Sequence, residues 1–170
     1  ANARIGIGTE VPSKMLTVGG DISASGGYIG SRTFETGSIT AVANNSGADI
    51  VYFGQASGLT AGTLYYLKTD GTWEAADADD NTKGADELLG IALGADATTN
   101  GMLLRGIVNV TGVSGLSNVG RAVYISTTAG DVTETAPSGN DNIVRIVGYV
   151  INANDTIYFN PGTTWVKVTA

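Results

Sequence analysis

The chain contains neither cysteine nor histidine among its 170 residues. Without cysteine, no disulfide or thiolate nucleophile is available, so packing and association must hold the fold together. Without histidine, the chain lacks the most common general base and the most common metal ligand. These absences exclude Ser-His and Cys-His catalysis. We therefore predict that the protein is not an enzyme and has no catalytic, cofactor-binding or metal-binding residues.

Basic residues are scarce. Lys and Arg number nine against 16 Asp and Glu, which gives a formal net charge of −7. Affinity for nucleic acid depends mainly on Lys and Arg side chains that displace counterions from phosphates. We therefore predict no nucleic-acid partner and interpret the acidic surface as a source of solubility.

Long hydrophobic runs are also missing. No apolar stretch approaches the roughly 20 residues that a membrane-spanning helix requires. The first residues, Ala1 to Arg4, lack the apolar centre of a secretory signal. We expect no insertion into a membrane.

Glycine, in contrast, is abundant. The 25 glycines lie mostly beside Ser, Thr, Asn or Asp, and hydrophobic residues make up 42% of the chain. This composition predicts an all-β fold with short strands and tight turns. Strands are expected at residues 38–43, 49–53, 63–68, 72–75, 88–94, 102–110, 122–126, 131–135, 143–151, 156–160 and 164–168.

The second part of the chain repeats itself at a spacing of 58 residues. The matched letters are turn glycines and strand hydrophobes, so the pattern duplicates a structural unit. We predict tandem repeats at about 57–110 and 114–168, packed as a β-sandwich or barrel within a domain spanning 36–170. The anchors are Gly62 and Gly120, Tyr66 and Tyr124, and Gly90 and Gly148.

The strand expected at 143–151 is apolar on both faces. Strict alternation places Ile143, Val147 and Tyr149 on one face, and Val144, Ile146 and Val150 on the other. A sheet with one solvated face would alternate with polar residues. We therefore predict that the second face meets another subunit or another sheet, and that the protein is a homo-oligomer.

Residues 77–87 form an acidic segment with two readings. Its oxygen-bearing side chains match the first half of a calcium-binding EF-hand loop and fail the second half. The alternative is a solvated loop between two strands, which we favour while leaving calcium open. The matching residues are Asp77, Asp79 and Asn81, and the failing ones are Thr82 and Leu88.

The aromatic residues mostly fall inside expected strands, which favours roles in the core or at a subunit interface. Trp73 differs because it directly follows the turn at Asp70 and Gly71. An exposed Trp ring is a common platform for sugars. Trp73 is therefore the residue that we predict to stack on a glycan.

The N-terminal segment has a recognisable pattern. Three short apolar pairs, Ile5/Ile7, Leu16/Val18 and Ile22/Ala24, alternate with small or polar residues and need a partner surface. The run from Ile5 to Gly26, IGIGT…P…LTVGGDISASG, resembles a segment common in bacteriophage tail fibres and related virion appendages. That resemblance implies an intertwined, trimeric β segment, here residues 1–35, that leads into a globular β domain.

The repeats resemble small β domains of phage capsid-decoration and head-fibre proteins. Each reads Gly, then Leu-Tyr or Val-Tyr, a turn Gly and a Gly within an apolar strand. The resemblances imply a trimeric structural virion protein, assembled in the bacterial cytoplasm and exposed on the particle beside other virion proteins. Capsid decoration, or a fibre tip that binds a host glycan or receptor, are the alternatives.

Overall fold

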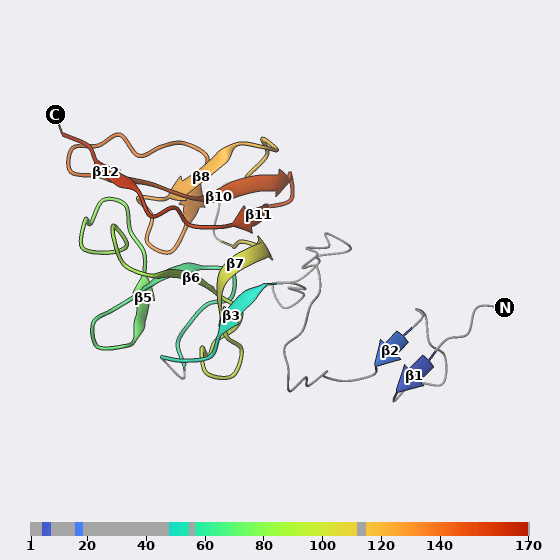
Figure 1. The fold of residues 1–170 in the computed structure, drawn as a ribbon. Helices are drawn as coiled ribbons and strands as arrows, with labels where there is room; N and C mark the ends of the chain where they lie inside the picture. The colour runs from blue at the N-terminus through green and yellow to red at the C-terminus, as the bar shows by residue number, and fades with distance from the viewer. Residues whose placement is uncertain (1–4, 8–15, 19–47, 55–56, 112–114, 170) are drawn as a thin grey trace. The chain divides into compact units, whose positions relative to one another are not determined.

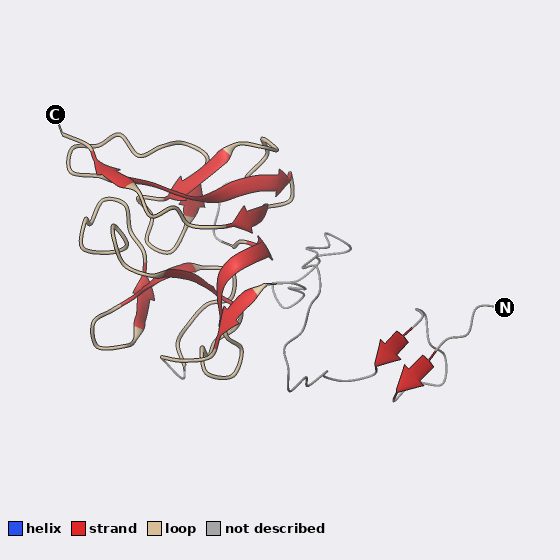
Figure 2. Cartoon of the chain, in the orientation of Figure 1, coloured by secondary structure: helices blue, strands red, loops and turns tan. Residues whose placement is uncertain are grey.

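The computed structural model describes residues 5–7, 16–18, 48–54, 57–111 and 115–169. The chain divides into two compact units, 1–32 and 33–170. Every regular element in the described residues is a β-strand, which confirms the all-β prediction (Figure 2). Within the same residues there is no helix long and apolar enough to cross a lipid bilayer.

The first unit contains one pair of strands. β1 (Ile5–Ile7) runs parallel to β2 (Leu16–Val18), with Ile5 opposite Leu16 and Ile7 opposite Val18. Ile7 is 59% exposed. The third apolar pair expected here, Ile22/Ala24, lies outside the described residues, as does the strand expected at 38–43.

The second unit is one ten-stranded antiparallel sheet that curls into a half-barrel (Figure 1). Its main path runs in the order β5-β4-β6-β7-β11-β10-β8-β9, while β3 pairs with β7 and β12 pairs with β10. The strands are β3 (Asp49–Val51), β4 (Leu64–Leu67), β5 (Trp73–Ala75), β6 (Leu89–Ala92), β7 (Met102–Asn109), β8 (Ala122–Ile125), β9 (Val132–Thr133), β10 (Ile143–Asn152), β11 (Thr156–Phe159) and β12 (Trp165–Lys167).

Strand β7 joins two half-sheets, which we define as β4–β7 and β8–β11. Its residues up to Arg105 pair with β3 and β6, and its residues from Gly106 onward pair with β11. Gly106 has a φ of 151°, and a Cβ there would lie 2.8 Å from the Cβ of Ala48. A glycine inside a strand often marks such a bend.

Part of the strand pairing in the first half-sheet recurs 58 residues later in the second. In this comparison β8 is the counterpart of β4, β9 of β5, β10 of β6 and β11 of β7. The order β5-β4-β6-β7 in the first half-sheet therefore matches the order β9-β8-β10-β11 in the second. In the first half-sheet Tyr65 lies opposite Gly90, and in the second Val123 lies opposite Gly148. The 2.8 Å hydrogen bond from the Gly62 N–H to the Ala92 carbonyl recurs from the Gly120 N–H to the Val150 carbonyl, also at 2.8 Å.

A main core fills the space between the half-sheets and draws side chains from both. A smaller outer core covers the opposite face of the first half-sheet. The main core includes Leu64, Tyr66, Leu89, Ile91, Leu103, Val108, Val123, Ile125, Val132, Val147, Val150, Ile157 and Phe159. The outer core consists of Leu59, Tyr65, Trp73, Ala92, Ala97 and Met102.

The chain just after β5 ties the half-sheets together on the side away from β7. Residues 76–78 exchange backbone hydrogen bonds with the turn between β8 and β9 and with the start of β10. The Gly130 N–H donates to the Ala76 carbonyl (2.7 Å), and the Ala78 N–H donates to the Ser126 carbonyl (2.8 Å). The Ile143 N–H in turn donates to the Ala78 carbonyl (2.7 Å).

The two faces that we predicted for β10 from strict alternation of its side chains are wrong in one respect. A register shift between Ile146 and Gly148 in the pairing with β8 reverses the alternation. Because of this bulge, Tyr149 leaves the buried face of Ile143 and Val147 and is exposed together with Ile146, while Val150 turns into the core.

We predict that Gly106→Ala destabilises the domain by about 1–3 kcal/mol, because an L-residue is strained at this φ and its Cβ meets Ala48. Equilibrium urea unfolding measures the loss. Gly162→Ala is the matched control, since its added Cβ would have its nearest contact at an ordinary 3.4 Å, to the Ile146 carbonyl. Equal stability of the two variants would contradict the assigned role of Gly106.

Candidate functional site

An apolar groove lies on the outer side of β8, β10 and β12. Its volume is about 630 Å³. Three of its side chains are prominently exposed: Ile146 at 36%, Tyr149 at 46% and Val166 at 57%. The lining residues are Tyr124, Val144, Ile146, Tyr149, Asn160, Gly162, Thr163, Thr164, Trp165 and Val166.

The chemistry of this groove suits binding rather than acid–base work. None of its lining residues carries a charge at neutral pH. The aromatic rings and aliphatic side chains offer apolar contact, while Asn160, Thr163 and Thr164 offer amide and hydroxyl hydrogen bonds. Such a surface can hold a neutral ligand or an apolar protein segment.

A second, smaller hollow of about 300 Å³ is polar and lies beside β9. Two of its lining oxygens already accept backbone hydrogen bonds: Ser126 Oγ from the Thr128 N–H (3.0 Å) and Thr133 Oγ1 from the Thr135 N–H (3.1 Å). These hydroxyls close turns locally, so the hollow is a weaker candidate than the groove.

The acidic segment 77–87 uses its carboxylates to close turns. Asp77 Oδ1 accepts a hydrogen bond from the Asp79 N–H at 3.3 Å. Asp80 Oδ1 accepts from the N–H (3.1 Å) and the hydroxyl (2.7 Å) of Thr82. Across the described residues, no three acidic side chains gather in a way that could hold a metal ion. The calcium reading therefore gains no support from the geometry.

The reading of this segment as a solvated loop is wrong for its inner side. Ala78 is fully buried, and Ala85 is 2% exposed. The Arg145 side chain, 6% exposed, reaches the segment from β10. Its Nη1 lies 2.8 Å from the Gly84 carbonyl and 2.9 Å from those of Ala85 and Glu87, and its Nε donates to Gly162 at 2.9 Å.

Arg145 therefore fastens segment 77–87 onto the second half-sheet. Burial lowers the pKa of its guanidinium, but arginine remains charged at physiological pH. A buried charge is costly unless it is hydrogen-bonded, and four carbonyl oxygens accept hydrogen bonds from Nε and Nη1 of this guanidinium. In the sequence, this role is indicated only by the position of Arg145 as a single charged residue inside an apolar strand.

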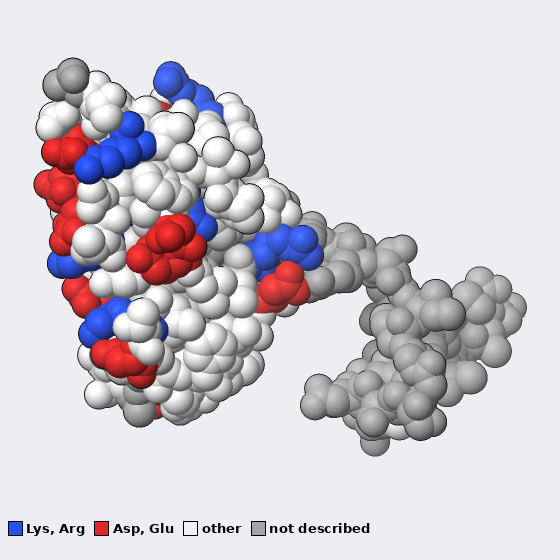
Figure 3. Space-filling model, turned by 60° about the vertical axis from the view of Figure 1, so that its left-hand side comes forward, with Lys and Arg blue, Asp and Glu red and all other residues white. Residues whose placement is uncertain are grey.

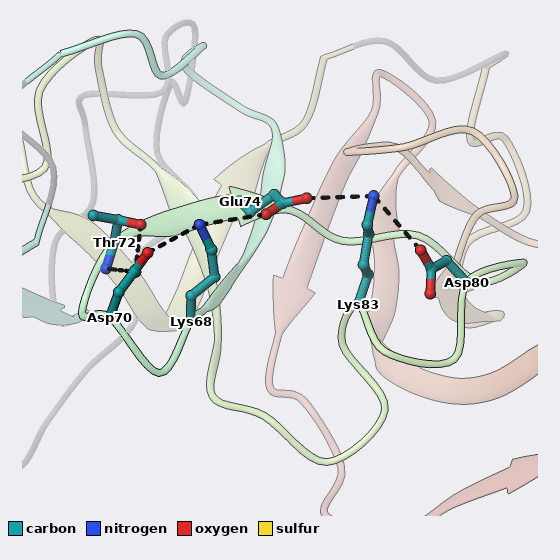
Figure 4. A network of polar contacts seen from close by, with 6 residues as sticks. All are labelled: Lys68, Asp70, Thr72, Glu74, Asp80 and Lys83. Atoms are coloured by element: carbon teal, nitrogen blue, oxygen red, sulfur yellow. Dashed lines mark hydrogen bonds and ion pairs between the residues drawn. The ribbon is translucent and has the colours of Figure 1, made fainter.

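A network of exposed charges lies on the outside of the same region (Figure 4). It joins the β4–β5 hairpin to segment 77–87. Lys68 Nζ lies 3.1 Å from Asp70 and 3.7 Å from Glu74, and Lys83 Nζ lies 3.3 Å from Glu74 and 3.6 Å from Asp80. Acidic and basic side chains also alternate elsewhere on the face seen in Figure 3. Such exposed pairs contribute little stability each.

Trp73 cannot serve as a sugar platform in this structure. Its side chain is only 3% exposed. The indole N–H donates to the Phe53 carbonyl at 3.0 Å, and the Phe53 ring stacks on the indole with a centroid distance of 5.7 Å. The chain that follows β3 covers the ring, which sequence position alone did not reveal. Partly exposed aromatic rings lie instead at Tyr149 and Trp165 in the groove.

Comparison of the chain with models of protein families, with curated proteins and with solved structures finds no match.

We predict that Arg145→Met costs about 3 kcal/mol or more, because it leaves buried carbonyls without donors. Urea unfolding measures the loss, and trypsin should cut after Lys83 faster once the segment is released. Lys167→Met is the control, since it removes only the exposed 2.7 Å ion pair with Asp141. Wild-type stability and cleavage in Arg145→Met would disprove the fastening role.

We also predict that the Asp77 carboxyl makes stability depend on pH. Burial, reinforced by Asp79, raises its pKa from 3.8 to about 6. The folded state therefore holds the proton more tightly, and stability falls as pH rises from about 4 to above 6. Asp77→Asn keeps the hydrogen-bond acceptor and should flatten this decline in urea midpoints.

Asp70→Asn is the matched control for the pH experiment. A hydrogen bond from the Thr72 hydroxyl lowers the pKa of Asp70 to about 2. The stability that ionised Asp70 contributes is therefore fully present above pH 3.8, and it is lost only as the pH falls toward 2. Between pH 4 and 7 this variant should keep the wild-type slope. If Asp77→Asn also kept the wild-type dependence of stability on pH, the assignment of that dependence to Asp77 would be refuted.

Proposed function

We propose that this protein is a structural component of a bacteriophage virion, a trimeric appendage of the tail-fibre or head-fibre type. Residues 1–35 would form an intertwined segment that joins three chains, and the β domain would be displayed on the surface of the particle beside other virion proteins. The proposal starts from the resemblance of residues 5–26 to fibre segments.

The observation that carries the proposal is the β1–β2 pair. Two parallel strands of three residues each bury too little surface to be stable alone. Parallel sheets are normally covered on both faces, yet Ile7 is 59% exposed. Further copies of the same segment would supply the missing cover and bring the chains together.

The β domain suits display because its duplicated features are structural. We interpret β4–β7 and β8–β11 as tandem copies of one unit. Equivalent turn glycines, Gly62 and Gly120, have φ values of 82° and 87°, and Gly71 and Gly130 have 83° and 84°. Glycine adopts this backbone conformation with less strain than residues that carry a side chain. The copied residues would thus build a rigid body rather than a reactive centre.

Two alternatives within a virion remain distinguishable by binding. A capsid-decoration protein would bind empty phage heads, whereas a receptor-binding tip would bind host cells or their glycans. The groove favours the second alternative, because Tyr149 and Trp165 offer ring faces and Asn160 offers an amide. A glycan array with purified protein separates these roles.

We predict that the full chain sediments at three times the 17.2 kDa of one chain. Ile7→Asp should shift sedimentation equilibrium toward the monomer, because a charge opposes burial of the β1–β2 pair. Val119→Asp, at a 65% exposed site in the β domain, is the control and should leave the trimer intact. A wild-type monomer at micromolar concentration would refute the proposal.

A further inference from the structure

Asn100 is the one asparagine in the sequence that is followed by glycine. The backbone nitrogen that follows an asparagine can attack its side-chain amide and close a succinimide ring. A side chain on the attacking residue hinders this ring closure, and glycine has none. The sequence thus offers a single place where the reaction is sterically easy.

The Asn100–Gly101 pair lies at the end of the loop that joins β6 to β7. Asn100 is exposed, and its Oδ1 accepts a hydrogen bond from the Asp96 N–H at 3.2 Å. The Asn100 N–H donates in return to the Asp96 carbonyl at 2.8 Å. The side chain folds back over Gly94, where an added Cβ would collide with the Asn100 Cγ. The amide is therefore held in one place and open to water.

The hydrogen bond on Oδ1 favours attack on this amide. Attack on Cγ moves negative charge onto Oδ1, and a fixed backbone N–H on that oxygen stabilises the charge. The donor is fixed by its own turn, because Asp96 Oδ1 accepts from the N–H and the hydroxyl of Thr98, both at 2.7 Å.

We propose that Asn100 is a site of spontaneous deamidation. The Gly101 nitrogen bonds to the Asn100 Cγ, the bond from Cγ to Nδ2 breaks, and Nδ2 leaves as ammonia with the proton from Gly101. Water then adds to one carbonyl of the succinimide ring and reopens it, which yields aspartate or isoaspartate. The sequence of steps needs water alone as a co-reactant.

The Asp70–Gly71 pair, the one Asp-Gly pair in the sequence, is protected from the same ring closure. The pKa of Asp70 is lowered to about 2, so its carboxyl is ionised at neutral pH and resists attack. Its Oδ1 also accepts from the Thr72 N–H and hydroxyl at 2.9 and 2.6 Å. The Gly71 N–H, which would have to attack, donates to the Lys68 carbonyl at 3.0 Å.

The modification falls where β3 is seated against the start of β7. Gly101 has a φ of 87°, and an added Cβ there would lie 2.5 Å from Cγ2 of Ile50 and 3.1 Å from Cε1 of Tyr52. Its carbonyl accepts from the Leu93 N–H at 3.1 Å. Isoaspartate at position 100 lengthens the backbone by one methylene and displaces Gly101 from Ile50. Deamidation therefore loosens β3.

Peptide mapping of the full chain, aged at mildly alkaline pH, tests the chemistry. Trypsin releases residues 84–105 as one peptide with Asn100 as its sole asparagine. Mass spectrometry should show conversion of this amide to acid, and a methyltransferase specific for isoaspartate should label the product.

Asn152 is the matched internal control for the ageing experiment. It is exposed, and its Oδ1 accepts from the Asn154 N–H at 3.2 Å, but alanine follows it. It should react at least about ten times more slowly than Asn100, because the alanine methyl opposes ring closure. Equal rates at the two residues, or an Asn100 that keeps its amide, would overturn the proposal.

Hydrogen exchange tests the consequence for β3. Exchange of the amides in Asp49–Val51 should rise at least about tenfold in the aged, modified protein, because their pairing with β7 opens more often. Equally aged Asn100→Gln should stay at the level of fresh protein, since a glutamine would have to close a larger ring.

Freshly prepared Asn100→Asp separates charge from backbone length. It carries the new charge on a backbone of normal length, so its β3 amides should exchange as in the unmodified protein. Modified protein with unchanged exchange would overturn the loosening of β3. Fast exchange in Asn100→Asp would assign the loosening to charge and overturn the displacement of Gly101.

Discussion

The fold depends on one buried charge and the oxygens around it. The Arg145 guanidinium donates to carbonyls of segment 77–87 and to Gly162, and so links β10 to the chain that leaves β5. The adjoining residues 76–78 add backbone hydrogen bonds to the same neighbours. Because β7 joins the half-sheets on one side only, these bonds keep the curled sheet from opening on the other. The exposed ion pairs of Lys68 and Lys83 lie on the outside of the same region and contribute less to stability than the hydrogen bonds of Arg145.

This constraint also explains how a chain without disulfides keeps long loops in place. The Asp-x-Thr turns at Asp70, Asp80 and Asp96 close on themselves through short side-chain hydrogen bonds. Such turns reduce the freedom of each loop locally, while Arg145 fixes one loop to a distant strand. Both devices rely on oxygen acceptors, which this acidic, threonine-rich sequence supplies in excess.

Local pattern was sufficient to place the strands and insufficient to orient them. Alternation and turn glycines predicted strands at 63–68, 88–94 and 156–160, close to the observed β4, β6 and β11. The same alternation put Tyr149 on the wrong face, because a bulge in β10 is set by its pairing with β8. The burial of Trp73 and the role of Arg145 each depend on a segment at least 20 residues away in the chain. Residue spacing in the sequence does not contain that information. The groove could not be predicted either, because it depends on both the bulge in β10 and the position of β12.

The shared main core has a consequence for how the protein is made. The core-facing side chains of the first half-sheet pack against many residues from Val123 onward, and the second half of β7 gains its partner only at β11. During translation, the first half-sheet therefore leaves the ribosome with Leu64, Tyr66 and Leu89 exposed, and waits for most of the remaining chain. Pairing of such distant segments is slow, and an uncovered apolar sheet is prone to join the wrong neighbour. Nascent chains of this protein should accordingly depend on chaperones, or on low local concentration, until the last strands have been synthesised.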